Sequence, residues 1–279
     1  MGNFREVLGV SEISSSKVID AVWKALLAEF LGNFLLNFFG CGSVIVMSST
    51  PPGAQPNFLL VAITFGLVVF VCVQALGHVS GAHLNPAVTA GMLSVGNIKI
   101  IKGLMYIIVQ CLGAIAGSAT LKALLPETLH TGGLGTTKLN TALEINPLQG
   151  FGFEFFLGFI LVLVVSGVCD PNRPEAKAAG PLAIGLAVAL GHMGAINFTG
   201  SSMNPARSFG SAVISGIWDD HYIYWLGPIV GGIIAAQIYH HALRAPTLTT
   251  VKIIERYSTV ADEKELRRLD GQKDADNYA

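Results

Sequence analysis

The stretch GHVSGAHLNPAVTAG, Gly77 to Gly91, is too apolar for an ordinary loop and too short to cross a bilayer. A second stretch, NFTGSSMNPARSFG from Asn197 to Gly210, places the same Asn-Pro-Ala in the same kind of setting. Each follows a long apolar run, and the interval from Gly66 to Asn85 equals the interval from Gly185 to Asn204. This repetition indicates that the chain is built from two related halves.

The composition is that of a membrane protein. Hydrophobic residues make up 52% of the chain and charged residues 13%, and the mean hydropathy is +0.58, a balance unsuited to a soluble surface. A hydrocarbon core of about 30 Å requires roughly 20 apolar residues of helix. The chain contains six such runs, and their apolar residues do not alternate with polar ones as they do in the strands of a β-barrel. The sequence therefore predicts an all-α membrane protein with six transmembrane helices. The six runs are Leu26 to Met47, Phe58 to Gly77, Leu104 to Leu125, Gly150 to Cys169, Ala179 to Phe198 and Tyr222 to Leu243.

The distribution of positive charge predicts the orientation. With both termini in the cytosol, the cytosolic side carries all seventeen Lys and Arg residues except Lys122, Lys138 and Arg207. The positive-inside rule therefore favours a multi-pass protein of the cell membrane with cytosolic termini. The net charge of −1 carries no information about partners, and we expect no nucleic acid among them.

Three spans in each half predict an inverted repeat. The segment AEFLG, from Ala28, parallels FEFFLG, from Phe153, and LGAIAG, from Leu112, parallels LGPIVG, from Leu226. Because three is odd, the second half must enter the membrane upside down, with its working site near the midplane at the repeat interface. We therefore expect an N-terminal segment 1–21, a channel domain 22–245 (repeat 22–125, linker 126–149, repeat 150–245) and a tail 246–279. Within the tail, DEKELRRLD at 262–270 suggests a short helix.

The two Asn-Pro-Ala segments predict two re-entrant half-helices. Pro86 and Pro205 suit the first helical position, and Asn85 and Asn204 suit the N-cap before it. Ala87 and Ala206 complete the two boxes. Neither half-helix can span, so their positive N-terminal ends meet inside the membrane, where irregular backbone must be buried or line water. The alternative, two capped turns that merely pack, suits a single box better than a symmetric pair.

These residues resemble the aquaporin, or major intrinsic protein, family. The resemblance rests on SGAHLNPAVT, on NPARSFG and on a Glu near the start of spans one and four, and it extends from about Ala21 to Leu243. It implies an aquaporin-like, right-handed bundle of six helices and two half-helices, with one pore per subunit in a homotetramer. It also implies passive, single-file water conduction without a cofactor, with selectivity from an Arg and half-helix dipoles, a known property of such pores.

Four residues match the aromatic/arginine filter of the water-selective members. At 1.5 Å per residue, Phe65 lies about 10 Å and His192 about 9 Å below the outer ends of their spans. Ser201, in the approach to the second half-helix, and Arg207, in its first turn, can reach the same level. Members that pass larger solutes carry a small residue in place of His192 and an Asp in place of Ser208, and this chain has neither. Taken alone, His192 is explained more simply as a buried core histidine. Arg207 favours the filter interpretation, because a charged side chain within the bilayer is costly.

Backbone carbonyls next to the boxes are expected to line the pore as hydrogen-bond acceptors. These stretches are not helical, so their carbonyl groups are available to water. The residues concerned are Gly81, Ala82, His83, Leu84, Gly200, Ser202 and Met203, in addition to Ser201.

Two intramembrane carboxylates, Glu29 and Glu154, allow two interpretations. A buried carboxylate in a membrane suggests a proton relay by default. Their repeat-related positions favour a structural role instead, in which each braces a re-entrant loop by accepting its backbone N–H groups.

Three classes of function follow. A passive water channel is the leading interpretation, a glycerol-type solute channel is the alternative, and a junction or adhesion protein could share the fold. An enzyme is not expected, because no nucleophile with a base, carboxylate pair or metal set occurs in one place. His78 and His83 have no third ligand nearby, so no metal site is predicted. The four isolated cysteines are interpreted as packing residues, with Cys72 as a candidate target of mercurials.

Overall fold

The structure is a computed structural model that describes residues 8, 16–49 and 55–246, and these ranges contain helices but no strand. Most of the predicted N-terminal segment and the predicted helix at 262–270 lie outside the described residues. The long helices are α2 (Ser16–Ser48), α3 (Phe58–Ser80), α5 (Ile100–Leu124), α6 (Pro147–Val168), α7 (Gly180–Thr199) and α9 (Ile223–Ile238). The short helices of the two boxes are α4 (Pro86–Ser94) and α8 (Pro205–Ser215).

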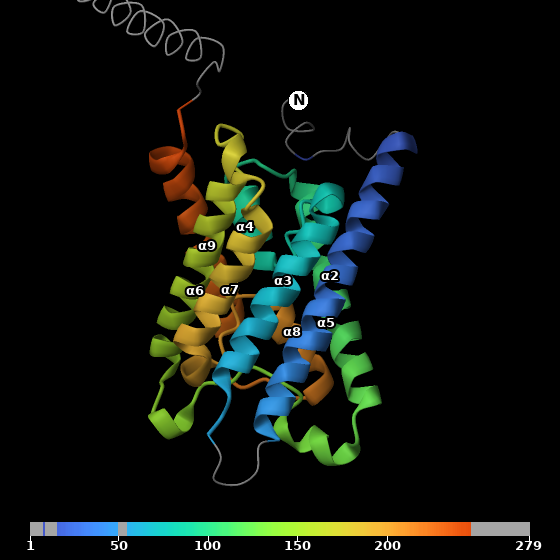
Figure 1. The fold of residues 1–279 in the computed structure, drawn as a ribbon, viewed down its shortest axis with the longest axis vertical. Helices are drawn as coiled ribbons and strands as arrows, with labels where there is room; N and C mark the ends of the chain where they lie inside the picture. Colours follow the sequence, from blue (N-terminus) through green and yellow to red (C-terminus); the bar gives the residue numbers. More distant parts are fainter. Residues whose placement is uncertain (1–7, 9–15, 50–54, 247–279) are drawn as a thin grey trace, which may run out of the picture. The chain divides into compact units, whose positions relative to one another are not determined.

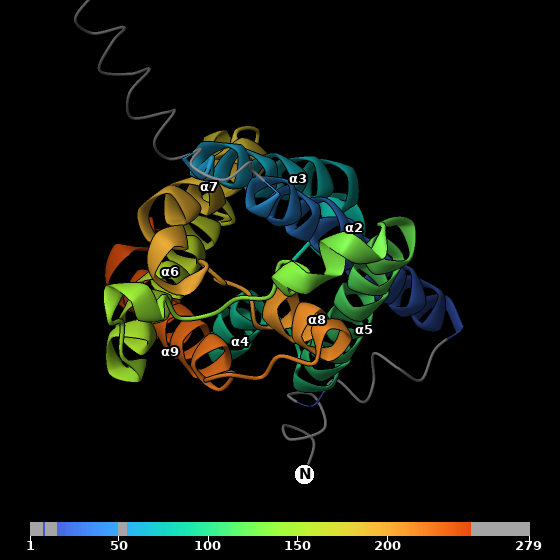
Figure 2. The same ribbon diagram turned by 90° about the horizontal axis from the view of Figure 1, so that it is seen from below.

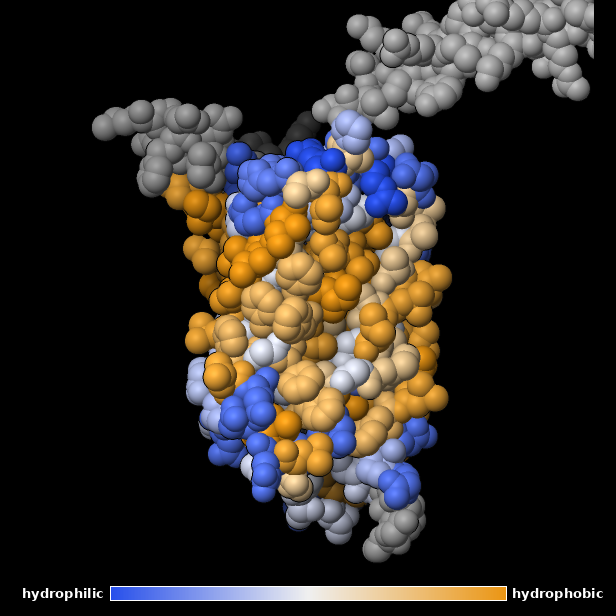
Figure 3. Space-filling model, turned by 90° about the vertical axis from the view of Figure 1, so that its left-hand side faces the viewer, coloured by the Kyte–Doolittle hydropathy of each residue, from blue (hydrophilic) through white to orange (hydrophobic). Residues whose placement is uncertain are grey.

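Among the described helices, five are long and apolar enough to cross a membrane: α2, α3, α5, α6 and α7. The sixth predicted span, Tyr222 to Leu243, consists of α9, with 16 residues, followed by a π-helical turn at Tyr239–Leu243. The apolar pattern located this span but could not reveal the change in backbone hydrogen bonding at its end. Figure 3 shows an apolar band between two polar ends, the surface expected of a bilayer-spanning body.

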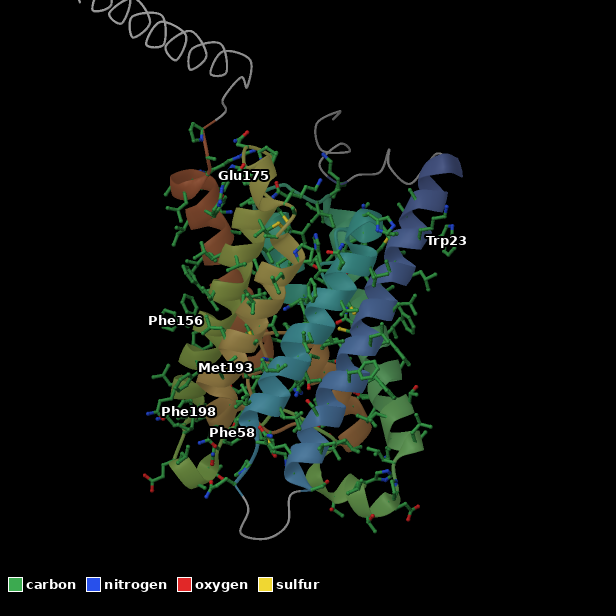
Figure 4. The ribbon with its side chains drawn as sticks, in the orientation of Figure 1. Trp23, Phe58, Phe156, Glu175, Met193 and Phe198 are labelled. Atoms are coloured by element: carbon green, nitrogen blue, oxygen red, sulfur yellow. The ribbon has the colours of Figure 1, made fainter. Side chains whose placement is uncertain are left out.

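The side chains agree with this surface. Phe156 is 68% exposed and points away from the helices, as an apolar group facing lipid does (Figure 4). In the same view Trp23, at the start of the first span, lies towards the same end as Glu175, whereas Phe58 and Phe198 lie towards the opposite end. The ends of the spans therefore alternate as the predicted topology requires.

Asparagine and glycine set the ends of the helices around the two boxes. Asn85 and Asn204 are the N-caps of α4 and α8, each followed by Pro at the first position, as the sequence predicts. Gly81 and Gly200 end α3 and α7 in the left-handed conformation, with φ of 88° and 79°. Glycine adopts this conformation without steric cost, so each long helix stops just before its box.

The two halves interlock. Within each half the first helix packs against the last, α2 against α5 and α6 against α9, while α3 packs against α7 across the halves. The half-helices are exchanged: α4 packs against α9 of the second half, and α8 against α5 of the first. Figure 1 shows α4 in the upper part and α8 in the lower part of the bundle, and Figure 2 shows both between α9 and α5.

Small residues permit the close contact within each half. A Cβ atom at Gly113 would collide with the carbonyl oxygen of Phe30, and one at Gly231 would collide with that of Phe155. The segments GAIAG and GPIVG are therefore sites of close approach, because glycines without side chains let the helix backbones touch. This contact fixes α2 and α6, the helices that carry Glu29 and Glu154.

Candidate functional site

The N-terminal ends of α4 and α8 meet through a reciprocal pair of hydrogen bonds. Asn85 Nδ2 donates to the Met203 carbonyl oxygen at 2.8 Å, and Asn204 Nδ2 donates to the Leu84 carbonyl oxygen at 2.7 Å. Each Oδ1 accepts from a backbone N–H of its own half-helix, that of Ala87 at 2.8 Å or Ala206 at 3.0 Å. A carboxamide carries two N–H groups, so each Asn keeps a second donor beyond this pair of bonds.

The loops that lead into the half-helices have the same unusual backbone. In each loop, the first, third and fourth residues before the Asn of the box adopt positive φ. Left-handed backbone costs a residue with a side chain roughly 1–2 kcal/mol, so other interactions must hold these loops. The residues and angles are Gly81 (88°), Ala82 (46°), Leu84 (52°), Gly200 (79°), Ser201 (49°) and Met203 (56°).

Glu29 is fully buried and supplies such interactions to the first loop. One carboxylate oxygen accepts from the Ser80 hydroxyl at 2.7 Å and from the His83 N–H at 2.9 Å. The other accepts from the Leu84 N–H at 2.7 Å and from Gln110 Nε2 at 2.8 Å. All four groups donate, which an ionised carboxylate accommodates because it only accepts.

Glu154, also fully buried, occupies the related place in the second half. Its Oε1 accepts from the Thr199 hydroxyl at 2.7 Å and the Ser202 N–H at 2.9 Å, and its Oε2 accepts from the Met203 N–H at 3.0 Å. Each loop is therefore held by one carboxylate, which belongs to the first helix of the same half.

Phe65 contacts two of the other three predicted filter residues. The rings of Phe65 and His192 stack with centroids 4.3 Å apart and planes inclined by 20°. The guanidinium carbon of Arg207 lies 5.1 Å from the centroid of the Phe65 ring. All three residues are at most 2% exposed. Ser201 is fully buried on the adjoining loop.

Hydrogen bonds fix the orientation of the two basic groups. His192 Nδ1 lies 2.9 Å from the Val188 carbonyl oxygen, which only accepts, so Nδ1 carries the proton. Arg207 Nη1 donates to the Gly135 carbonyl oxygen at 2.7 Å. Within the part of the chain that the structure describes, three buried atoms here have no hydrogen-bond partner: His192 Nε2, Arg207 Nε and Ser201 Oγ.

The linker contributes to the site, which the sequence interpretation missed. Gly135, at φ of 75°, fits so tightly against Cys41 of α2 that a Cβ atom would lie 2.8 Å from the Cys41 Cβ. This contact places the carbonyl that binds Arg207. Asn37 of α2 was also missed: its Nδ2 donates to the Arg207 carbonyl oxygen at 3.1 Å. The one available signal was the Gly-rich segment GGLG at 132–135.

Other predicted residues make contacts outside the group of Phe65, His192 and Arg207. The His83 ring contacts the Thr89 hydroxyl, with Nδ1 at 3.1 Å, and the Tyr106 ring, so only its backbone is a candidate for the pore wall. Ser208 hydrogen-bonds the hydroxyl groups of Thr137, at 2.7 Å, and Ser202, at 2.6 Å. The box residues Pro86, Ala87, Pro205 and Ala206 are buried.

The packing interpretation of the cysteines holds for two of the four. Cys41 and Cys72 are buried, and Cys111 is partly buried. Cys169 is exposed, so the interpretation is wrong for this residue: it caps the end of α6, outside the helix contacts that bury the others.

Comparison with known proteins agrees with this geometry. The sequence profile described as "MIP: Major intrinsic protein" matches residues 14–239. The chain is 40% identical to Aquaporin-4 of Mus musculus over 243 residues, covering 87% of this chain and 74% of that protein. It is 42% identical to Aquaporin-1 of Canis lupus familiaris over 254 residues, covering 86% and 93%. In structure it is similar to the aquaglyceroporin from Plasmodium falciparum, with a TM-score of 0.68, 26% identity and coverage of 80% and 97%.

A bundle of long apolar helices around two opposed half-helices that meet at their N-terminal ends is the architecture of a membrane channel. The chain belongs to the major intrinsic protein family. It is an integral membrane protein and a water channel of the aquaporin type, not an enzyme.

Proposed function

We propose that this channel selects water at a filter formed by Phe65, His192, Ser201 and Arg207. The observation that carries the proposal is the buried contact of the Phe65 ring with both His192 and Arg207. A constriction of this kind has one apolar wall and one polar wall. It removes the hydrogen-bonded neighbours of a passing water molecule and replaces those hydrogen bonds on the polar side alone.

The polar wall suits a water molecule. With the proton on Nδ1, a neutral His192 ring presents Nε2 as an acceptor, while Arg207 Nε presents a donor. Water can donate to the first and accept from the second in one passage. The fixed charge of Arg207 repels cations at the same level.

The half-helix junction interrupts proton transfer along the water file. The second N–H groups of Asn85 and Asn204, beyond those used by the two carbonyls, donate to a water at the junction. That water then has both lone pairs engaged and cannot accept a proton from a neighbour. The N-terminal ends of α4 and α8 add positive potential there. Loop carbonyls at 81–84 and 200–203 supply acceptors on either side.

Glu29 and Glu154 act as braces of the two loops rather than as a proton relay. Every contact given above for their carboxylates comes from a donor, and most of these donors belong to the loops. A relay requires a neighbouring acceptor to which the proton passes, and the backbone N–H groups among these contacts cannot accept one.

The channel is a homotetramer of the cell membrane with both termini in the cytosol. The positive charges outside the spans favour this orientation. Its units are the segment 1–21, the channel domain 22–245 with repeats 22–125 and 150–245 about the linker 126–149, and the tail 246–279.

Stopped-flow measurements on liposomes that contain the purified protein test the proposal. We expect rapid osmotic shrinkage, exclusion of glycerol and no ionic current. Glycerol uptake as fast as water flow would favour a solute channel, and the absence of any flow above that of empty liposomes would favour a junction or adhesion role.

Mercurials are expected not to block the wild-type pore at the filter. Ser201 stands where several family members carry a reactive cysteine, and its hydroxyl has no hydrogen-bond partner among the described residues. Ser201→Cys should therefore create inhibition that a thiol reductant reverses. Cys72→Ser is the control, because Cys72 is buried between α2 and α3, with its sulfur 4.0 Å from the Gly32 carbonyl oxygen. Strong inhibition that persists in Cys72→Ser would contradict this expectation.

A further inference from the structure

We infer that Gly40 is a positioning residue that sets the bore of the proposed filter. It lies on α2, outside the set of residues that the family motifs identify, and it contacts the filter only through Phe65. The inference rests on the filter assignment above.

Gly40 is the surface against which the edge of the Phe65 ring lies. The three heavy atoms nearest to a Cβ atom built on Gly40 all belong to this ring. Such a Cβ would collide with Cε1, and it would lie 2.5 Å from Cζ and 2.9 Å from Cδ1. Carbon atoms in contact are normally about 3.5–4.0 Å apart, so the ring occupies space that exists only because residue 40 has no side chain.

Two other neighbours of the Phe65 ring are members of the proposed filter. Its face is covered by His192, whose ring is held by the Val188 carbonyl. Arg207, 5.1 Å from the ring centroid, is held by the Gly135 carbonyl. The backbone of Phe65 belongs to the long helix α3. A side chain at position 40 therefore drives the ring into the space between His192 and Arg207, which is the lumen of the proposed filter.

The same helix offers a matched control. Gly42 lies two residues further along α2, and a Cβ atom there would meet one atom within 4 Å, Cδ1 of Leu121 at 3.6 Å. This is an ordinary van der Waals contact. Replacing either glycine by alanine favours the helix by the same intrinsic amount, so a difference between the two variants arises from the Phe65 ring.

The experiment compares water permeability per channel in liposomes that contain the wild type, Gly40→Ala, Gly42→Ala, Phe65→Leu and Gly40→Ala/Phe65→Leu. We expect Gly40→Ala to lower the permeability by roughly threefold or more, because an overpacked ring narrows a single-file passage. Gly42→Ala should match the wild type. In the double variant leucine lacks Cε1 and Cζ, the two atoms nearest to the added Cβ, so the permeability should equal that of Phe65→Leu.

Two results would overturn the inference: a normal permeability of Gly40→Ala, or a loss that persists undiminished in the double variant. If Gly40→Ala fails to fold, the comparison of Phe65→Leu with the double variant still tests the inference. The inference requires these two variants to have equal water permeability, and a lower permeability of the double variant contradicts it. The filter assignment fails separately, if Phe65→Leu leaves both water permeability and glycerol exclusion unchanged.

Discussion

Replacing His192 by Gly and Arg207 by Val in one protein should open the channel to glycerol. The change removes the ring that stacks on Phe65 and the guanidinium that lies beside it, so the proposed filter loses its polar wall. A pocket that discriminates by one methylene does so by roughly 10- to 200-fold, and closure of a single-file passage is stricter. Glycerol uptake should therefore rise at least tenfold by this estimate, with water permeability the same or higher.

The double variant should also leak protons, because the half-helix ends would act without the charge of Arg207. Arg173→Val is a control for the loss of an arginine, since Arg173 lies in a loop with its side chain 45% exposed. Equal glycerol uptake by the wild type and the double variant would refute the filter and favour the solute-channel alternative.

Glu154→Leu should abolish most of the water permeability and lower the thermal stability of the channel. Leucine accepts no hydrogen bond, so the buried N–H groups of Ser202 and Met203 and the Thr199 hydroxyl lose their acceptor. Each unsatisfied buried group costs about 1–3 kcal/mol. Since about 1.4 kcal/mol changes a population tenfold, the loop should abandon its native conformation and displace α8 with Arg207.

Glu175→Leu makes the same replacement in a short 3-10 helix (Pro174–Ala176), at a side chain that is 70% exposed, and should leave both quantities unchanged. Glu154→Gln retains an amide oxygen for some of these donors and should be affected less than Glu154→Leu. Proton currents in the wild type that disappear in Glu154→Gln, with water flow intact, would instead establish the relay interpretation.

The sequence predicts the half-helices closely because their signals are local. Asn followed by Pro starts α4, α8 and also α6, where Asn146 forms a capping box with Gln149. The six spans follow from the length of their apolar runs, apart from the π-helical end of the last. Such features depend on residues within a few positions of one another.

The contacts that orient the filter could not be predicted in this way. The Gly135 carbonyl that binds Arg207 is 72 residues away in the sequence, and Asn37 is 170 residues away. Every residue has a backbone carbonyl, so the identity of a residue does not reveal which carbonyl binds Arg207. The composition of the linker indicates only a loop. The contact of Gly40 with Phe65 is hidden for the same reason, since a glycine in an apolar helix indicates only that some neighbour approaches closely.

The reciprocal bonds between the boxes also bear on how the channel is made. Asn85 requires a carbonyl that lies 118 residues later in the chain, and α4 requires α9, the last helix of the second half. During synthesis the first loop and its half-helix are therefore inserted before their partners exist. In a channel truncated after its first half, Asn85 should lack its native acceptor. The first half should therefore reach its native structure only after the second half has been synthesised.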